Sequence, residues 1–213
     1  MTILITPQNR HRYAAELDGV YRLRHWTFND WLGWGLAQRE GREVDPYDDQ
    51  AIHFVKLADD GEVLSCWRAM PTTRPYMTME VYPEVFGDRE PPVSPDIWEL
   101  SKFCTARYRL KDDKAATYRI IAEMTVAVTE FCVAYGVTEL LSVQSAVVTR
   151  VANMFLGEPI WTGPTVWPGD TDATLYSYEP SLMQAHVLRA RHGLAAGPSL
   201  DHFDVLGLKT VAA

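Results

Sequence analysis

The chain has 213 residues, 47% of them hydrophobic, and a formal net charge of −8 at pH 7. The acidic balance, without a block of lysine or arginine, argues against nucleic-acid binding, and no apolar run is long enough to cross a membrane. Three cysteines without close spacing indicate neither disulfides nor a metal site, which favours a reducing cytoplasm.

The N-terminal quarter is predicted to be a strand, a helix and a long loop. Residues 2–6 are apolar and β-branched, as in a short strand. From Asn9 onward apolar residues recur at three- and four-residue steps, which predicts a helix that carries Arg24 near its end. Glycines at three later positions break any helix, so residues 31–49 are predicted to be mostly loop.

A β-hairpin is the clearest local signal in the chain. The segments 52–58 and 62–70 flank an Asp-Asp-Gly turn. Residues 71–95 are rich in proline and predicted to be a long excursion with one helical turn near 80–86. Residues 97–107 alternate as a strand, and one face is predicted to carry Trp98, Leu100, Lys102 and Cys104.

The second half alternates between helices and strands. Residues 115–135 are predicted to be the longest helix, capped by Asp113 and stopped by Gly136. A parallel strand at 138–143 should follow it. The remaining predictions are a helix at 145–156, an edge strand at 160–166, a strand at 173–178, a helix at 181–191 and a loosely held tail at 195–213. No repeat or linker divides the chain, so residues 1–213 are predicted to be a single domain.

The order hairpin, strand, long helix, parallel strand resembles the acyl-CoA N-acyltransferase superfamily. The resemblance implies an α/β fold, a three-layer α-β-α sandwich whose mixed sheet contains a splayed parallel strand pair that admits an acyl carrier's arm. The glycines of that superfamily's pyrophosphate loop are absent here. Basic residues take their place before the long helix and either attract phosphates or form a solvated turn: Arg107, Arg109, Lys111 and Lys114.

Residues 21–49 combine aromatic rings with charges. Rings offer stacking faces, arginine offers a planar fork for a carboxylate, and acidic residues suit an amine or a sulfonium. A ligand that is both flat and charged would fit this segment. Each residue taken alone has a plainer interpretation, since tryptophans mostly pack in cores and acidic clusters are mostly solvated.

Eight residues across this segment and the next strands stand at distinctive spacings: Arg24, Phe28, Trp34, Asp45, Asp48, Arg68, Glu99 and Lys102. Their order and spacing resemble the acyl-homoserine-lactone synthases, the autoinducer synthases of bacterial quorum sensing. The similarity runs from about residue 13 to residue 155. Lys102 stands where the family generally has arginine, which turns a bidentate contact into a point charge. Tyr82 replaces a phenylalanine, and the helix after Val143 ends differently.

The resemblance implies a two-substrate enzyme without a cofactor. S-adenosylmethionine supplies the amine, and an acyl thioester on coenzyme A or an acyl carrier protein supplies the acyl group. After acylation the methionyl carboxylate attacks its own γ-carbon, releasing methylthioadenosine and a lactone. Two alternatives stay open: an ordinary N-acyltransferase for another amine, and a non-catalytic regulatory domain that binds S-adenosylmethionine. The oligomeric state is left open.

The same resemblance implies roles for particular residues. Glu99 is expected to be the base, with an ion pair to Arg68 or Lys102 as its structural alternative. S-adenosylmethionine binding is expected of Arg24, Phe28, Trp34 and Asp45. A structural ion-pair network is expected of Asp48, Arg68 and Lys102. A backbone N–H within 103–106 is expected to hold the oxyanion.

The expected acyl-pocket residues lie on the two splayed strands, the long helix and the excursion. They are Met77, Trp98, Phe103, Met124, Ser142 and Val143. The expected phosphate or phosphopantetheine residues are Arg107, Arg109 and Lys114. The segment GREVDPYDD is similar to the branch of the family that uses coenzyme A thioesters of short branched or aryl acids.

Overall fold

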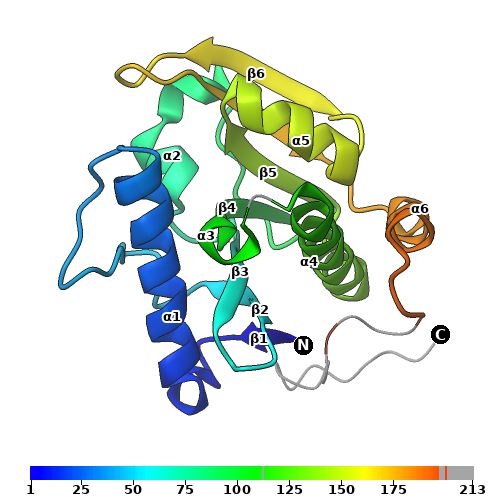
Figure 1. Cartoon of the computed structure of the whole chain (residues 1–213). Helices are drawn as coiled ribbons and strands as arrows, with labels where there is room; N and C mark the ends of the chain where they lie inside the picture. The colour runs from blue at the N-terminus through cyan, green and yellow to red at the C-terminus, as the bar shows by residue number, and fades with distance from the viewer. Residues whose placement is uncertain (112, 197–199, 201–213) are drawn as a thin grey trace.

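The structure, a computed structural model, describes residues 1–111, 113–196 and 200 (Figure 1). One seven-stranded sheet runs through it in the order β1-β2-β3-β4-β5-β7-β6. The strands are β1 (Thr2–Ile5), β2 (Ile52–Leu57), β3 (Val63–Pro71), β4 (Ile97–Thr105), β5 (Glu139–Gln144), β6 (Trp161–Val166) and β7 (Ala173–Tyr178). The helices are α1 (Ala14–His25), α2 (Met77–Val81), α3 (Arg107–Leu110), α4 (Lys114–Ala134), α5 (Ala146–Leu156) and α6 (Leu182–His192). Three short turns of other helix types are η1 (Arg10–Arg12), η2 (Trp26–Trp31) and η3 (Pro83–Phe86).

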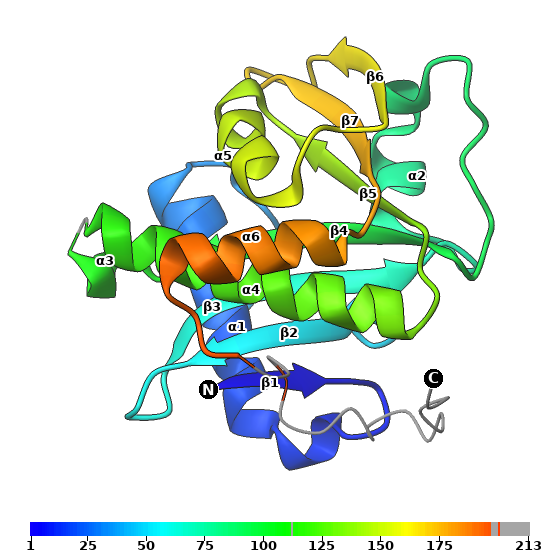
Figure 2. The ribbon, with the colours of Figure 1, turned by 90° about the vertical axis from the view of Figure 1, so that its right-hand side faces the viewer.

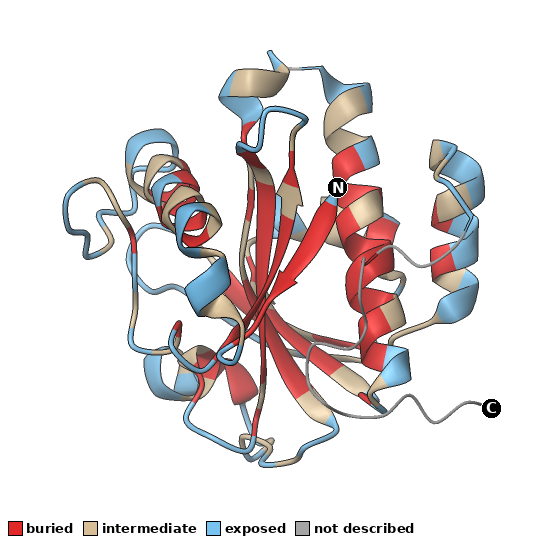
Figure 3. Cartoon of the chain, turned by 90° about the horizontal axis from the view of Figure 1, so that it is seen from below, coloured by how far each residue is buried: buried red, intermediate tan, exposed pale blue. Residues whose placement is uncertain are grey.

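Helices cover both faces of the sheet, which confirms the predicted three-layer sandwich. Val55 and Leu57 of β2 pack on the α1 side, whereas Ile52 and Phe54 pack on the α4 side. This alternation is what a strand buried on both faces requires. Figure 2 shows α6 lying alongside α4, and Figure 3 shows the buried helix surfaces turned toward the central sheet.

The parallel pair β4 and β5 separates after a short contact. Only three residue pairs join them, from Ile97 with Glu139 to Glu99 with Leu141. Beyond Glu99, β4 runs on to Thr105 without a β5 partner, while β5 continues its pairing with β7 as far as Gln144. The predicted splayed pair is therefore present, and Glu99 lies at the point where the strands part.

The predicted N-terminal cap and C-terminal stop of the long helix are confirmed. Asp113 accepts hydrogen bonds from the backbone N–H groups of Ala115 and Ala116, and Gly136 has a φ of 71° just past the end of α4. The excursion after β3 contains two short helical turns, α2 and η3, where one was predicted. In the described part of the chain no helix is both long and apolar enough to span a bilayer. The predicted tail lies almost entirely outside the described residues.

The predicted alternation along β4 is wrong from Lys102 onward. Lys102 has a left-handed φ of 57°, and the register with β3 shifts between Cys66 and Arg68. Such a bulge inserts one residue and exchanges the two faces beyond it. Cys104 therefore packs on the α1 side, and Phe103 packs on the α4 side. Lys102 itself is turned toward the carboxylates of the N-terminal loop.

Candidate active site

Arg24 is the centre of a buried ion-pair network on the α1 side of the sheet. Its side chain is fully buried, and its Nε donates to Glu43 at 2.5 Å while Nη1 donates to Asp48 at 2.6 Å. Burial alone would lower the pKa of Arg24, but the carboxylates of Asp48 and Glu43 raise it well above its ordinary value. The guanidinium therefore stays charged and holds the loop against α1.

Arg68 on β3 reaches the same carboxylates from the sheet. Its Nη1 donates to Asp45 and, at 3.0 Å, to Asp48, and its Nε donates to Ser101 at 3.0 Å. Burial alone would raise the pKa of Asp48, yet the charges of Arg24 and Arg68 hold it well below its usual range. Asp48 thus bridges two arginines that come from different elements.

Lys102 joins the network from the bulge in β4. Its Nζ contacts Glu43 at 2.7 Å and Asp45 at 3.5 Å, and it lies 5.3 Å from the centre of the Phe28 ring. Glu43 therefore pairs with two cations, although the sequence assigned it no role beyond the acidic cluster.

Two polar atoms of this network are buried without a hydrogen-bond partner among the described residues. They are Nη2 of Arg24 and Oδ2 of Asp45, which are 3.8 Å apart. Oδ2 of Asp45 lies within ion-pair distance of Arg24 and of Lys102, whose Nζ is 3.5 Å away, but neither it nor Nη2 of Arg24 forms a hydrogen bond to a described residue. Buried polar atoms without a hydrogen bond are costly unless something binds them. A ligand carrying both a carboxylate and a cation would satisfy both.

An aromatic pair lies beside the network. The rings of Phe28 and Trp34 stack at 5.2 Å with an interplanar angle of 17°. Phe28 is buried, whereas Trp34 is 46% exposed, so Trp34 forms the outer wall. Its position is fixed by a hydrogen bond from its backbone N–H to the carbonyl of Phe28. Rings next to a cation-binding carboxylate suit a flat ligand with a positive centre.

Glu99 lies at the divergence of β4 and β5 and is fully buried. Its Oε1 accepts a hydrogen bond from the backbone N–H of Thr78 at 2.6 Å, and its Oε2 accepts one from Ser101 at 3.4 Å. Within the described ranges it forms no ion pair with Arg68 or Lys102, so the structural alternative for Glu99 is not seen. The same Ser101 accepts from Arg68, which links Glu99 to the network.

His53 on β2 is buried behind the network, 3.9 Å from Asp48, and its Nε2 has no hydrogen-bond partner in the described part of the chain. Burial lowers the pKa of His53 to about 4, although the Asp48 charge opposes the shift. An imidazole with a lowered pKa takes up its proton on unfolding. The stabilising contribution of the neutral His53 side chain is therefore fully present above the ordinary histidine pKa of about 6.5. It is lost as the pH falls toward the folded-state pKa of about 4.

We expect the free energy of unfolding to drop by about 2 kcal/mol between pH 7 and pH 5 through this group alone. Urea unfolding of the wild type and of His53→Gln at both pH values measures it. The variant should show a flatter dependence, since its side chain does not titrate. Equal slopes in the two proteins would contradict the assignment to His53.

The expected acyl-pocket residues divide between the two faces of the sheet. Trp98 and Met124 are buried in the core under α4, and Phe103 packs against that core. Ser142 lies on β5 between Leu141 and Val143, whose side chains pack on the opposite side with η3. Met77 lies at the start of α2, with its sulfur 3.7 Å from Nη2 of Arg68. The two sets can meet only where the strands part, because an intact sheet separates them.

The basic residues after β4 do not act as one cluster. Arg109 pairs with Asp60 and Glu62 at the hairpin turn. Arg107 lies over the Trp31 ring at 4.6 Å. Lys114 begins α4, whose first N–H groups are already taken by Asp113.

Several residues of the site were not predicted from sequence. Ser101 connects Arg68 to Glu99, Thr78 fixes Glu99 through a backbone N–H, and His53 backs the network. None of these carries a sequence signal, because their importance depends on contacts between elements distant along the chain. Glu43 is one of several acidic residues in the segment 21–49, and nothing in the sequence distinguishes it from Asp49, which is exposed.

Comparison with known proteins shows which family the chain is similar to. The family model described as autoinducer synthase matches residues 8–155. An acyl-homoserine-lactone synthase of Aliivibrio fischeri is 35% identical over 138 residues, covering 64% of this chain and 71% of that protein. An isovaleryl-homoserine lactone synthase of Bradyrhizobium diazoefficiens is 33% identical over 170 residues, covering 74% of this chain and 75% of that protein.

The similarity to a solved structure covers more of this chain than the two sequence matches do. A coenzyme A-dependent acyl-homoserine lactone synthase, BjaI, solved with S-adenosylmethionine and isopentyl-coenzyme A, superposes with a TM-score of 0.80. Its sequence is 28% identical, and the superposition covers 94% of this chain and 92% of that one.

Proposed function

This chain belongs to the autoinducer synthase family, and we propose that it is an acyl-homoserine-lactone synthase whose acceptor substrate is S-adenosylmethionine. The enzyme transfers an acyl group from a thioester to the amine of S-adenosylmethionine and then closes the lactone. It is thus an acyltransferase that makes a quorum-sensing signal. The single observation that carries this proposal is the open pair of buried atoms, Arg24 Nη2 and Asp45 Oδ2, beside the stacked rings of Phe28 and Trp34.

S-adenosylmethionine fits this arrangement because it carries a carboxylate, an amine, a sulfonium and an adenine. Arg24 Nη2 donates to the carboxylate, and Asp45 Oδ2 attracts the cationic part. Phe28 and Trp34 shelter the adenosine and the sulfonium. Arg24 and Asp45 are themselves held in place by ion pairs: Arg24 with Asp48, and Asp45 with Arg68 and Lys102.

The first chemical step is acyl transfer in the gap between β4 and β5. Glu99 takes a proton from the substrate ammonium, directly or through one water, and the free amine attacks the thioester carbonyl. The C–S bond of the thioester then breaks and the thiol leaves. A backbone N–H of residues 103–105 holds the oxyanion; Ala106 is unsuited because its N–H donates to Leu64.

The second step is lactone closure. An oxygen of the methionyl carboxylate attacks the γ-carbon of its own chain, the C–S bond to the sulfonium breaks, and methylthioadenosine leaves with the electron pair. The sulfonium is already a good leaving group, so this step depends on holding the carboxylate and the γ-carbon close together. Arg24 positions the carboxylate for that attack.

The acyl chain lies at the divergence of β4 and β5, where both faces of the sheet become accessible. Trp98, Phe103 and Met124 approach it from the α4 side, and alternation along β5 places Ser142 on that same side. Val143 packs on the opposite face with η3, and Met77 at the start of α2 lies near Arg68. The thiols of all three cysteines are free and buried, which supports a cytoplasmic location.

One assay tests the proposal against its alternatives. The purified protein is incubated with S-adenosylmethionine and a panel of acyl thioesters on coenzyme A and on acyl carrier protein, and the products are identified by mass spectrometry. Lactone together with methylthioadenosine supports the synthase. Binding of S-adenosylmethionine without turnover indicates a regulatory domain, and acylation of another amine indicates an ordinary N-acyltransferase.

Replacing Trp34 by alanine should weaken S-adenosylmethionine binding about tenfold, because one stacking wall is lost while the buried ion pairs remain. Isothermal titration calorimetry measures the affinity. Trp167→Ala is a matched control, since Trp167 is 67% exposed and lies just beyond β6. Native affinity in Trp34→Ala would remove the stacking role of this ring.

A further inference from the structure

Trp34, the outer ring of the proposed acceptor site, lies in a segment that is neither helix nor strand. It stands between Gly33 and Gly35, whose φ angles of 68° and 62° are left-handed, and a Cβ added at either glycine would meet no atom within 4 Å. Because glycine has the widest backbone freedom of any residue, the ring keeps one position only if other groups fix the chain on both sides.

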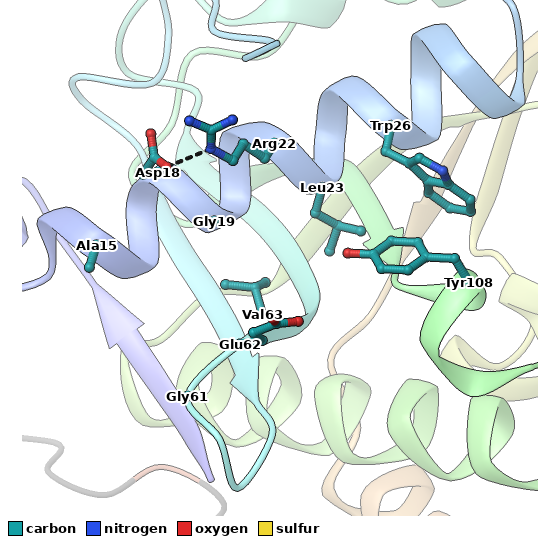
Figure 4. Close-up of a pocket in the computed structure, with 10 residues that line it drawn as sticks. All are labelled: Ala15, Asp18, Gly19, Arg22, Leu23, Trp26, Gly61, Glu62, Val63 and Tyr108. Atoms are coloured by element: carbon teal, nitrogen blue, oxygen red, sulfur yellow. Dashed lines mark hydrogen bonds and ion pairs between the residues drawn. The ribbon is translucent and has the colours of Figure 1, made fainter.

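A hollow of about 640 Å³ beside α1 does not provide that support. It is bordered by α1, the hairpin turn and Tyr108, and Figure 4 shows two of its lining residues, Asp18 and Arg22, paired with each other. Neither Phe28 nor Trp34 is among the described residues that line it. The support for Trp34 therefore has to come from contacts between its own loop and η2.

Two anchors fix the chain around Trp34. On one side, the Trp34 N–H donates to the carbonyl of Phe28 at 2.7 Å. On the other side, the N–H of Leu36 donates to Oδ1 of Asn29 at 2.7 Å, and the carbonyl of Leu36 accepts from Nδ2 of Asn29 at 3.1 Å. The Leu36 side chain is half-buried against the apolar cluster between α1 and the sheet. Asn29 thus makes the same pair of hydrogen bonds to Leu36 that a neighbouring strand would make.

The orientation of the Asn29 amide is fixed by its partners. Its oxygen faces the N–H of Leu36, so its two N–H hydrogens point to the Leu36 carbonyl and to Nδ1 of His25, which is 3.0 Å away. This network assigns Nδ1 of His25 as the acceptor and places the ring proton on Nε2, which lies 3.7 Å from Asp30. Every donor and the facing acceptor of the amide is therefore in use.

The π-helix η2 brings both anchors together. Its N–H of Leu32 reaches back five residues to the carbonyl of Thr27 at 3.0 Å. Phe28, which stacks on Trp34, and Asn29, which binds Leu36, are consecutive residues of this turn. Single turns of this kind occur frequently at functional sites. One turn of chain thus supplies the inner ring of the pair and holds the outer one.

We propose that Asn29 is a positioning residue for the acceptor substrate, because its clamp on Leu36 holds Trp34 against Phe28 before S-adenosylmethionine binds. This inference rests on the proposed function and adds an uncharged residue that acts through Trp34. A ring that is already in place loses less conformational freedom when the ligand binds. The affinity for S-adenosylmethionine therefore depends on Asn29, although its amide is occupied by Leu36 and His25.

A double-mutant cycle on the full chain tests this role. Calorimetry measures the S-adenosylmethionine affinity of the wild type, Asn29→Ala, Trp34→Ala and the double variant. Asn29→Ala should weaken binding about three- to tenfold. The KM for S-adenosylmethionine should rise by the same factor while kcat changes by less than about twofold. In the Trp34→Ala background the change at Asn29 should have no further effect, since it acts through that ring.

Asn9→Ala is the matched control. Asn9 makes an equivalent clamp after β1, where it accepts from the N–H of Thr6 at 2.7 Å and donates to the carbonyl of Leu4 at 3.0 Å. Its loss should leave the S-adenosylmethionine affinity unchanged. Asn29→Ser is a second variant at the site, with a polar side chain too short to reach Leu36, and it should behave as Asn29→Ala does.

Limited digestion with chymotrypsin gives a readout without substrate. The bond after Trp34 should be cut faster in Asn29→Ala than in the wild type or in Asn9→Ala, because the released segment opens locally. An unchanged cutting rate, native affinity in both Asn29 variants, or an equal loss of affinity in Asn9→Ala would overturn the inference. Additive losses in the double variant would also overturn it. These outcomes concern the variants alone, whereas a wild type that binds no S-adenosylmethionine would contradict the proposed function itself.

Discussion

Glu99→Gln is expected to lower the turnover number by about 10²- to 10⁴-fold, the range typical for loss of a general base. The amide keeps an oxygen that accepts the N–H of Thr78, so the side chain stays in place. Glutamine cannot take the proton from the substrate ammonium. The affinity for S-adenosylmethionine should change little, because the groups proposed to bind it lie in the Arg24 network.

The comparison that isolates this effect uses Glu84→Gln, an exposed glutamate on η3. Single-turnover rates and calorimetric affinities for S-adenosylmethionine are measured for both variants and the wild type. Glu84→Gln should match the wild type in every value. If Glu99→Gln keeps a rate within a few-fold of the wild type, Glu99 is not the base, and the proton goes directly to water or to another group.

The elements that the sequence predicts well are those whose signals are local. The hairpin has a turn tripeptide between two apolar strands, and α4 has a capping Asp113 and a stop at Gly136. The order of strands and helices resembles the acyl-CoA N-acyltransferase superfamily, and that resemblance implied the splayed pair, which the structure confirms. Each of these features depends on neighbours within a few residues or on chain order.

The bulge at Lys102 shows what local reasoning cannot supply. Strict alternation places Lys102 beside Trp98 and Leu100, which pack under α4. The left-handed backbone at Lys102 instead turns its ammonium group toward Glu43, and this contact forms only after α1, the loop and β4 have come together. An ion pair across 59 residues of sequence leaves no periodic signal.

Local reasoning was also insufficient for the basic residues that the sequence analysis expected to bind phosphate. Four basic side chains before α4 look alike in sequence, yet Arg109 pairs with the hairpin turn and Lys114 follows a capping carboxylate. Arg107 lies over the ring of Trp31. The distinction comes from which side chains the fold brings near each cation, and that depends on contacts between elements that are distant along the chain.

Arg24→Met is expected to lower the free energy of unfolding by about 3–5 kcal/mol, because it leaves buried carboxylates without one of their cations. Glu43 and Asp48 are both almost fully buried, so water cannot replace the guanidinium. A domain of this kind has a total stability of about 5–15 kcal/mol, so the loss is a large fraction of it. Urea unfolding at pH 7 measures the change.

Arg22→Met is the natural control for this prediction, since it lies two residues earlier on the same helix. The Arg22 side chain is 53% exposed and pairs with Asp18, and such a surface pair contributes about 0–1 kcal/mol. A double variant, Arg24→Met with Asp48→Asn, should lose less than the sum of the two single losses, because the second change removes the unpaired charge that the first creates. Equal losses in Arg24→Met and Arg22→Met, or strictly additive losses in the double variant, would show that the network does not hold the loop through charge pairing. In that case Asp45 Oδ2 and Arg24 Nη2 would have no fixed position from which to bind a substrate, and the acceptor site would have to be sought elsewhere.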